Sequence, residues 1–498
     1  MASPKQQADS TRAATVELAG TRPFGMRDKI GYMFGDFGND FTFTLQATFF
    51  MVFYTNAVGI EPGHVGLLLL GARVMDGFTD VGMGIIVDRL PVKREGEKFR
   101  RWLKFIAVPV ALASCLMYSA FVADFASYGA RLAWMCATYF LWGSLCYTAI
   151  NIPYGSMSSV VSSDPDHRAE LSVYRSTGAT LANIAITTLI PLVIYSTNSE
   201  GVSVLSGPAM NISAAVCSVL AVVCYALCYF NVQERVVTVA DPDSSSKAGI
   251  GTMLGSIFTN RALLGLIAAA LLLLVSTLFA GGMISYLFLN YFGNGRLQSP
   301  ASLAGLLPGL VLIVLAPWLS RRFGKAEVGA VAMLGGGTVL IIAYFLHITS
   351  AVLWIVLYAI AMFSTAIFNY LVWAFITDVI DFQEVRTGHR DDGTVYAVYS
   401  WSRKLGQALA GGLSGWALGW IGFSTEAATS GAEQTQAVND GIYMLANLVP
   451  GVGYVLVGLA LVFLYPLKKK VVDANNEILT ARRAAGTGDA QGSASPAH

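Results

Sequence analysis

The stretch LLGLIAAALLLLVSTLFAGGMISYLFL, residues 263–289, contains no charged side chain and decides the class of fold. A run of this length exceeds the roughly 18–20 apolar residues that cross about 30 Å of hydrocarbon as a helix. Two similar blocks stand at residues 105–123 and 444–465. Of the 498 residues 55% are hydrophobic and 13% charged, about half the charge of a typical soluble protein. We therefore expect an all-α membrane protein that crosses the bilayer several times.

Apolar blocks of this kind predict about twelve spans. The widest polar gap, residues 231–256, lies near the middle and divides the chain into two halves of about six spans each. The predicted spans are near residues 30–55, 62–88, 102–123, 130–155, 172–196, 208–230, 261–291, 300–320, 328–348, 351–378, 395–421 and 441–466. The predicted organisation is an N-terminal tail (1–29), a six-helix bundle (30–231), a central linker (232–260), a second six-helix bundle (261–467) and a disordered C-terminal tail (468–498).

Basic residues predict the orientation of the spans. Lys and Arg are dense at residues 88–102, 320–325 and 467–470, whereas the alternate connections 58–63 and 347–351 contain neither. Because cytoplasmic loops carry the excess of Lys and Arg, both termini and the central linker are expected in the cytoplasm, with the spans in the cell (inner) membrane. An even number of spans is required for this arrangement.

The overall charge and the cysteines exclude other classes of protein. The net charge is +1, which gives no indication of a nucleic-acid partner. The six cysteines all lie in apolar blocks of the first half and none forms a C-x-x-C pair, so we expect neither a disulfide framework nor a zinc site.

The two halves resemble each other in sequence. Residues 152–168 and residues 373–390 each run from an apolar helix through Asp to a His-Arg pair, and the two segments are six spans apart. Paired six-helix halves that enclose a site at the bilayer midplane are the construction of many secondary transporters.

Acidic residues inside the first two spans are the main functional signal. A charge at mid-bilayer costs about 2.5–3.5 kcal/mol on insertion scales, so such residues need a compensating role. Asp36 and Asp40 are four residues apart in the first span, and Asp76 and Asp80 are four apart in the second, which places each pair on one helix face. Two close carboxylates can share a proton, and with neutral oxygens they can hold Na⁺. Interhelical salt bridges or positions at helix ends are the alternative interpretation. The candidate cation-binding residues are Asp76, Asp80, Thr79, Thr148 and Asn151, with a Na⁺ site at Asp76 and Asp80 if the ion is sodium.

Cationic and aromatic side chains in the spans are candidates for contact with a sugar. Lys404 lies well inside the eleventh span and Arg175 near the start of the fifth, although snorkelling to the interface is an alternative for Arg175. Aromatic faces pack against the apolar face of a sugar ring, although most membrane aromatics are packing or interfacial residues. The candidate substrate-binding residues are Asp40, Asn151, Arg175, Lys404, Tyr147, Trp373, Tyr396 and Ser400. Asp88, Arg89, Arg321 and Arg322 are candidates for gating salt bridges in the basic loops, and a purely topological role is the alternative.

Six segments, at residues 31–41, 54–60, 72–88, 151–157, 377–384 and 390–411, resemble the glycoside–pentoside–hexuronide:cation symporters of the major facilitator superfamily. The similarity extends in order and spacing from about residue 28 to 425. It implies two six-helix bundles of the major facilitator fold, alternating access, and cotransport of sugars with Na⁺, Li⁺ or H⁺. By position, Asp76 and Asp80 match the family's cation-binding acids and Thr148 a hydroxyl beside that cation. Asp40 and Arg175 match sugar-binding residues, and Lys404 matches a lysine that links cavity charges.

The chain also departs from the melibiose-carrying branch of this family. Asn151 stands in place of a sugar-binding Asp, Gly155 in place of a stacking Trp, Thr79 in place of an Asn beside the cation acids, and Asn369 in place of another aromatic. With one acid fewer beside Arg175 and Lys404, an anionic sugar such as a uronide is the preferred substrate, and a pentoside is the alternative. Proton coupling is slightly favoured over Na⁺, because a carboxylate takes up a proton without a cage of ligands.

The expected function is import of a sugar or glycoside by symport with H⁺ or Na⁺, with no other cofactor, by a chain that acts as a monomer among membrane lipids. A lipid or lysolipid transporter of the same fold is an alternative, and the number of buried charges counts against it. An integral-membrane transferase is a weaker alternative, because the sequence has no nucleotide motif and no soluble domain larger than the linker. We therefore do not expect an enzyme.

Overall fold

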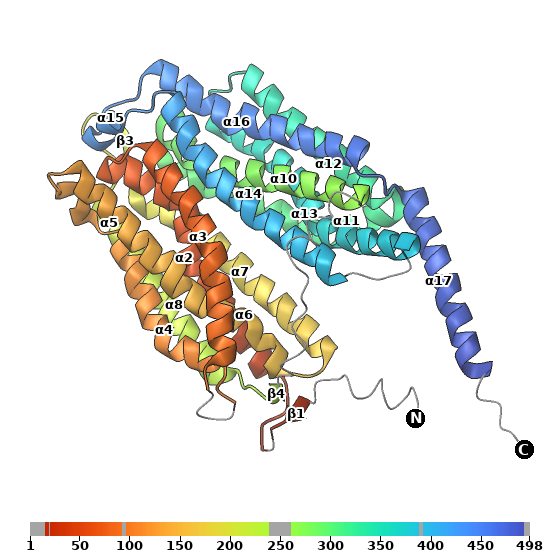
Figure 1. Cartoon of the computed structure of the whole chain (residues 1–498). Helices are drawn as coiled ribbons and strands as arrows, with labels where there is room; N and C mark the ends of the chain where they lie inside the picture. Colours follow the sequence, from red (N-terminus) through yellow and green to blue (C-terminus); the bar gives the residue numbers. More distant parts are fainter. Residues whose placement is uncertain (1–14, 19, 92–95, 239–259, 388–391, 493–498) are drawn as a thin grey trace, which may run out of the picture. The chain divides into compact units, whose positions relative to one another are not determined.

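The computed structural model describes residues 15–18, 20–91, 96–238, 260–387 and 392–492 (Figure 1). The chain divides into two compact units, which are described separately. Unit 1 comprises Met1–Ser246, Gly293–Ser299 and Leu418–Thr435, and unit 2 comprises Lys247–Phe292, Pro300–Ala417 and Gln436–His498.

Unit 1 is built from long helices in which two π-helical turns extend or join α-helices. The turn η1 (Tyr54–Val58) continues α2, and η3 (Leu141–Tyr147) joins α5 to α6 without a break. The α-helices of this unit are α2 (Met26–Phe53), α3 (Pro62–Arg89), α4 (Arg100–Met117), α5 (Tyr128–Phe140), α6 (Thr148–Val161), α7 (Pro165–Ile194), α8 (Gly207–Asn231) and the short α15 (Thr425–Ser430), with 3-10 turns η2 (Ala120–Asp124) and η5 (Gly295–Leu297).

The helix α2 packs along α7 and α8 at close range. Gly178 of α7 allows this approach, because a Cβ atom there would lie 2.4 Å from the carbonyl oxygen of Met33. Small residues at helix contacts are the usual means by which membrane helices come together. The centre of α2, which carries Asp36 and Asp40, is thereby held against two neighbouring helices.

Two short antiparallel pairs of strands lie at the ends of the unit 1 helices. The strand β1 (Thr15–Glu17) pairs with β4 (Val236–Thr238), so the start of the chain meets the residues after α8. Arg235 reinforces this junction through its guanidinium, 2.8 Å from Asp28. The second pair, β2 (Tyr195–Thr197) and β3 (Ser203–Leu205), connects α7 to α8 as a hairpin.

Unit 2 is a second set of long helices. The turn η4 (Leu287–Tyr291) continues α10, and η6 (Ala460–Leu464) continues α16. Thus η1 and η4 each extend the first long helix that the structure describes in their unit. The α-helices are α10 (Arg261–Tyr286), α11 (Gln298–Phe323), α12 (Lys325–Phe345), α13 (Ala351–Thr387), α14 (Asp392–Trp420), α16 (Gln436–Leu459) and α17 (Lys469–Gly492).

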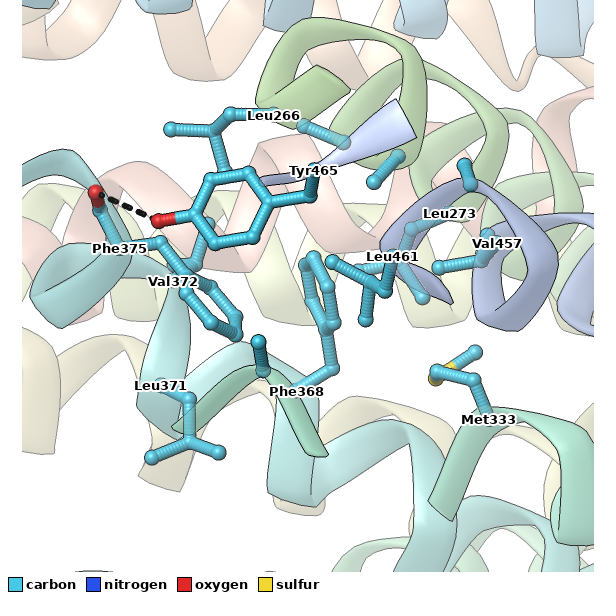
Figure 2. Close-up of a cluster of buried hydrophobic side chains, with 14 of the residues drawn as sticks. Leu266, Leu273, Met333, Phe368, Leu371, Val372, Phe375, Val457, Leu461 and Tyr465 are labelled. Atoms are coloured by element: carbon cyan, nitrogen blue, oxygen red, sulfur yellow. Dashed lines mark hydrogen bonds between the residues drawn. The ribbon is translucent and has the colours of Figure 1, made fainter. Parts of the chain in front are cut away.

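The core of unit 2 is a cluster of apolar side chains where α10, α12, α13 and α16 meet (Figure 2). Tyr465 closes the cluster: its ring is buried and its hydroxyl donates a hydrogen bond to the carbonyl oxygen of Phe375 at 3.5 Å. The phenol can therefore be buried, because its polar hydroxyl keeps a hydrogen-bond partner. The labelled members are Leu266, Leu273, Met333, Phe368, Leu371, Val372, Phe375, Val457, Leu461 and Tyr465.

The prediction of a multispanning all-α fold is confirmed. Among the described residues, seven helices are long and apolar enough to cross a membrane. Further long helices occupy the other predicted positions, namely α2, α3, α11, α14 and the continuous rod α5–η3–α6. The apolar character of α3 is interrupted by Arg73, Asp76 and Asp80, the residues that the sequence identifies as functional candidates.

The C-terminal segment differs from its prediction. Composition indicates a disordered tail after residue 468, whereas the structure has the helix α17 over Lys469–Gly492. Leu479 of this helix is 3% exposed, and Arg482 donates to the carbonyl oxygens of Glu384 and Val385 at the end of α13. These contacts with α13 stabilise a helix that composition alone does not predict.

Candidate functional site

The acid pair of α3 faces two hydroxyl groups from the neighbouring helical rod. The Oγ atom of Ser144 donates to an Oδ atom of Asp76 at 2.9 Å, and Oγ1 of Thr148 donates to Asp80 at 3.1 Å. Both hydroxyl residues are buried, at 6% and 5% exposure. The spacing of four residues in each helix produces this match, because both pairs repeat after about one turn.

A cationic side chain completes this group. The guanidinium of Arg73 lies 3.4 Å from the second Oδ atom of Asp76, and the side chains are 22% and 17% exposed. Arg73 also lies over the ring of Phe43 on α2, 5.7 Å from its centre. Asp76 thus interacts with a hydroxyl on one oxygen and with a guanidinium on the other.

Thr79 is not part of this arrangement. Its hydroxyl donates to the carbonyl oxygens of Met75 and Asp76 in its own helix, each at 3.3 Å. The structure therefore brings Asp76, Asp80 and Thr148 together and adds Ser144. Within the described residues, no group of three or more His, Cys, Asp or Glu gathers as a metal site. The contacts described here bring together the oxygens of two carboxylates and two hydroxyls.

A second charged group links α2 to α7. The Nε atom of Arg175 donates to Asp36 at 3.1 Å, with side-chain exposures of 38% and 12%. Asp40, one turn along α2, experiences the charges of both Asp36 and Arg175. Asp36 is therefore the direct partner of Arg175, and Asp40 is the second acid of this group.

The ring of Tyr154 forms a platform for this ion pair. The Arg175 guanidinium lies 5.4 Å from the centre of the ring, within the range of a cation–π interaction. Tyr154 and Tyr32 stack with centroids 4.7 Å apart, and each hydroxyl donates to the other residue's carbonyl oxygen, at 2.6 and 3.2 Å. Gly35 makes room for the ring, because a Cβ atom there would lie 2.1 Å from Tyr154. A rigid contact between α2 and α6 thus supports Arg175.

Asn151 stands on the rod between Thr148, which contacts Asp80, and Tyr154, which contacts Arg175. Its side-chain oxygen accepts from Asn39 at 3.4 Å, and Asn39 in turn accepts from the Tyr225 hydroxyl at 2.8 Å. Tyr147 lies in the same region: its ring stacks on Phe43 at 5.7 Å, and the charges of both groups act on it. The polar contacts of unit 1 therefore occupy a region that involves α3, the rod η3–α6, α2 and α7.

One face of the rod η3–α6 carries this whole region. Ser144, Thr148, Asn151 and Tyr154 follow one another at spacings of three or four residues, which is the repeat of one helix face. Two features distort this rod, the π-helical turn η3 and Pro153 inside α6. Both are established causes of kinks, and π-helical turns are frequent at functional sites.

The candidates in unit 2 are placed as follows. Lys404 is exposed on α14, and Trp373 of α13 is 48% exposed and meets the ring of Tyr399 at 5.8 Å. The side chains of Tyr396 and Ser400 lie outside what the structure describes.

Of the gating candidates, Arg89 is exposed in the last turn of α3, and the side chain of Asp88 lies outside the described part. Arg321 and Arg322 are exposed at the end of α11, where their carbonyl oxygens accept from Lys469 at 3.0 and 2.9 Å.

Several polar residues of the structure were not identified from the sequence. Ser144 could have been found, because it stands four residues before Thr148 and repeats the spacing of the acids. Nothing in the sequence pairs Lys325 with Asp378, yet the two form a 2.6 Å ion pair in which Asp378 is 5% exposed. Glu234 accepts from the backbone N–H groups of Lys98, Phe99 and Arg100 at the start of α4. Burial raises the pKa of Glu234, and these hydrogen bonds oppose the rise.

Comparisons with known proteins identify the family and the fold of the chain. The family model described as MFS/sugar transport protein matches residues 31–469. A glucuronide carrier protein homolog of Escherichia coli (strain K12) is 30% identical over 89% of this chain and 93% of its own length. A putative sulfoquinovose importer of Salmonella typhimurium is 29% identical over 90% and 92%. Among solved structures, that of a D-xylose-proton symporter has a TM-score of 0.60 at 11% identity, with 88% of this chain and 97% of that chain covered, and shows likeness of fold.

Proposed function

The chain belongs to the MFS/sugar transport family, with the motifs of its glycoside–pentoside–hexuronide:cation symporters, and we propose that it imports a sugar or glycoside by symport with a cation. Membership and the apolar helices identify a multi-pass membrane protein of the major facilitator fold. The observation that carries the proposal is the acid pair of α3 beside the buried hydroxyls of Ser144 and Thr148, in one polar region with the Asp36–Arg175 pair.

Cation binding at Asp76 and Asp80 is the first step of the proposed mechanism. A proton or Na⁺ neutralises negative charge there, and the hydroxyls of Ser144 and Thr148 supply oxygen ligands if the ion is Na⁺. Because these hydroxyls sit on the rod that also carries Asn151 and Tyr154, a change in their hydrogen bonds reaches Arg175 through one element. Coupling between two sites of this kind usually has a free energy of about 1–3 kcal/mol.

The sugar is proposed to bind beside Arg175, with Asp40, Asn151 and Tyr147 as further contacts in unit 1. Lys404, Trp373, Tyr396 and Ser400 remain the candidate contacts from unit 2. Alternating exposure of the loaded site to the two sides of the membrane then completes transport.

An anionic sugar, such as a uronide, is the proposed substrate class. Arg175 is 38% exposed and can offer N–H groups besides the one directed at Asp36. Guanidinium groups bind carboxylates and sulfonates through paired N–H donors. The names of two relatives contain glucuronide and sulfoquinovose, which are both sugars with an acidic group.

The expected topology has both termini in the cytoplasm and the spans in the cell (inner) membrane, and the chain is proposed to act as a monomer. The basic connections after α3 and α11 then lie on the cytoplasmic side, where Arg89, Arg321 and Arg322 are exposed. Together with Asp88 they remain the proposed gating residues.

Uptake into proteoliposomes tests the proposal. Asp76→Asn and Asp80→Asn are expected to abolish accumulation driven by an imposed H⁺ or Na⁺ gradient while exchange of preloaded sugar survives. Asp124→Asn, at an exposed position at the end of η2, is the matched control and should leave accumulation intact. Unchanged concentrative uptake in both α3 variants would contradict the proposal.

The cation and the substrate class need separate assays. A proton symporter makes the outside alkaline when sugar is added in Na⁺-free buffer, and the absence of that signal would exclude H⁺. Paired uptake of a glucuronide and of the matching neutral glucoside tests the charge of the substrate. Arg175→Gln should reduce uptake of the glucuronide more than that of the neutral sugar, and transport of the neutral sugar alone by the unmodified chain would reject a uronide.

A further inference from the structure

The helix α17 stands apart from the transport machinery. It begins at Lys469, only a few residues after the end of η6 at Leu464, and it turns sharply away from the direction of α16 (Figure 1). Its side chains are described as far as Arg482. A helix that directly follows the last span starts at the membrane surface.

Two cationic side chains fasten α17 across the ends of other helices. The Nζ atom of Lys469 donates to the carbonyl oxygens of Arg321 and Arg322, at the C-terminus of α11. Thirteen residues later, which is about 20 Å along a helix, the guanidinium of Arg482 donates to carbonyl oxygens at the C-terminus of α13. Cations at helix C-termini bond to the last carbonyl groups, which have no partner within the helix.

This attachment sets the direction of α17. The helices α11 and α13 are spans of the same unit, and α17 bonds to the C-terminal ends of both. A helix held at the ends of two spans lies over those ends and across the spans. The buried side of α17 comprises Leu479 and Asn475, at 3% and 8% exposure, and faces α13.

The exposed surface of α17 has two flanks that differ in chemistry. At 100° per residue, one flank comprises Val471, Ala474, Ile478 and Ala481, which are all exposed and uncharged. Of these, Val471 is 37% and Ile478 is 42% exposed. The other flank is polar and comprises Asp473, Asn476 and Thr480, and Glu477 lies between the two.

A positive charge borders the apolar flank where α17 leaves the last span. The side chain of Lys470 is exposed in the first turn of the helix, on the edge of that flank. Its neighbour Lys469 contacts the end of α11, where the side chains of Arg321 and Arg322 are also exposed. Basic side chains therefore gather at this end of α17.

We propose that the flank formed by Val471, Ala474, Ile478 and Ala481 rests in the headgroup region of the bilayer and that Lys470 binds anionic lipid there. Interfacial helices place apolar side chains at the boundary between headgroups and acyl chains and hold basic residues near lipid phosphates. Anionic leaflets attract basic residues clustered beside a span, which is the place of Lys470. A lipid surface is adjacent to this helix because the helix directly follows the last span. A protein partner has no such fixed place beside it.

A pair of labelled variants tests the proposal in the full-length protein. Ile478→Cys and Thr480→Cys place a fluorescent label on the apolar and the polar flank, about 160° apart around the helix and at nearly the same distance from the last span. Each is reconstituted in nanodiscs of phosphatidylcholine with or without phosphatidylglycerol, and the unmodified chain, treated identically, corrects for its six native cysteines. Quenching by a lipid-attached nitroxide reports contact with the bilayer, and quenching by aqueous iodide reports contact with water.

The label at position 478 is expected to be quenched by the nitroxide and the label at 480 by iodide. Adding Lys470→Gln to the first variant should weaken the association about fivefold in the discs with phosphatidylglycerol, which is the effect of one basic group at an anionic surface. Equal iodide quenching at both positions would overturn the proposal. Protection of position 478 from both quenchers would also overturn it, because that result indicates contact with a second copy or another protein. A nitroxide signal that does not change with phosphatidylglycerol would overturn it as well. Unchanged thermal unfolding of the variants serves as the control for folding.

Discussion

Replacing Gly35 by Ala should disrupt the support of Arg175, although Gly35 is proposed to contact neither the sugar nor the cation. The added Cβ atom would lie 2.1 Å from one ring carbon of Tyr154 and 2.8 Å from two others. Real Cβ atoms do not approach a ring so closely, so either the ring or α2 must move. The ring cannot move freely, because it is fully buried, stacks on Tyr32 and is fixed by two reciprocal hydrogen bonds.

The magnitude follows from these contacts. Overpacking of a filled core costs about 1–3 kcal/mol. A displaced Tyr154 hydroxyl loses its carbonyl partner in a buried place, which costs about 1–3 kcal/mol more. The higher helix propensity of Ala returns about 1 kcal/mol. The expected net loss for Gly35→Ala is therefore about 1–5 kcal/mol in the free energy of unfolding. Gly71→Ala on α3 is the matched control, because nothing lies within 4 Å of its Cβ position.

Thermal unfolding of the purified variants in one detergent measures the stability, and equilibrium binding of the transported sugar measures the effect on Arg175. Gly35→Ala should unfold at a clearly lower temperature than Gly71→Ala and bind sugar more weakly. In a double-mutant cycle, Gly35→Ala should lower the free energy of unfolding less in a Tyr154→Leu background than in the unmodified chain, since the clash with the ring is then absent. Identical unfolding temperatures for Gly35→Ala and Gly71→Ala would refute the reasoning.

Three further predictions concern polar contacts. Thr148→Val should lower the free energy of unfolding in cation-free buffer by about 1.5–3 kcal/mol, because the charged carboxylate of Asp80 loses the hydrogen bond that the Thr148 hydroxyl donates. Thr148→Ser keeps the hydroxyl and should keep this stability. Equal losses of stability in the two variants would contradict the prediction. Lys325→Met should lower the free energy of unfolding by about 3–5 kcal/mol in a thermal unfolding assay, and the loss should be near the lower end because Lys325 is 32% exposed. Adding Asp378→Asn should restore much of this stability, because it removes the buried charge. Burial raises the folded-state pKa of Glu234 above 4.5, so its stabilising contribution is present below pH 4.5 and is lost as the pH rises through the folded value. As the pH rises above 4.5, the unfolding temperature of the unmodified chain should therefore fall relative to that of the Glu234→Gln variant. Parallel pH profiles of the two proteins would show that the pKa of Glu234 is not raised.

The helices could be predicted from the sequence because each apolar block must satisfy its own backbone polar groups in the bilayer. The placement of Asp76 and Asp80 on one face followed from their spacing in a regular helix. Their partner Ser144 has the same four-residue spacing from Thr148, and its contact with Asp76 depends on how α3 packs against the rod, which the sequence does not show.

Long-range pairs could not be predicted. Arg175 and Asp36 are far apart in the sequence, and their contact depends on the close packing of α2 and α7, which Gly178 permits. The same holds for the C-terminal tail: its composition is typical of disorder, and the helix α17 is explained by the bonds that Lys469 and Arg482 make with the ends of α11 and α13.

The pairing of β1 with β4 has a consequence for synthesis of the chain. Thr15 lies opposite Thr238, so every long helix of unit 1 is encoded between two strands that must meet. A nascent chain cannot form this pairing until the residues beyond α8 have left the ribosome. The strand pair can therefore close only after all the long helices from α2 to α8 have been synthesised, and its closure does not require the second half of the chain.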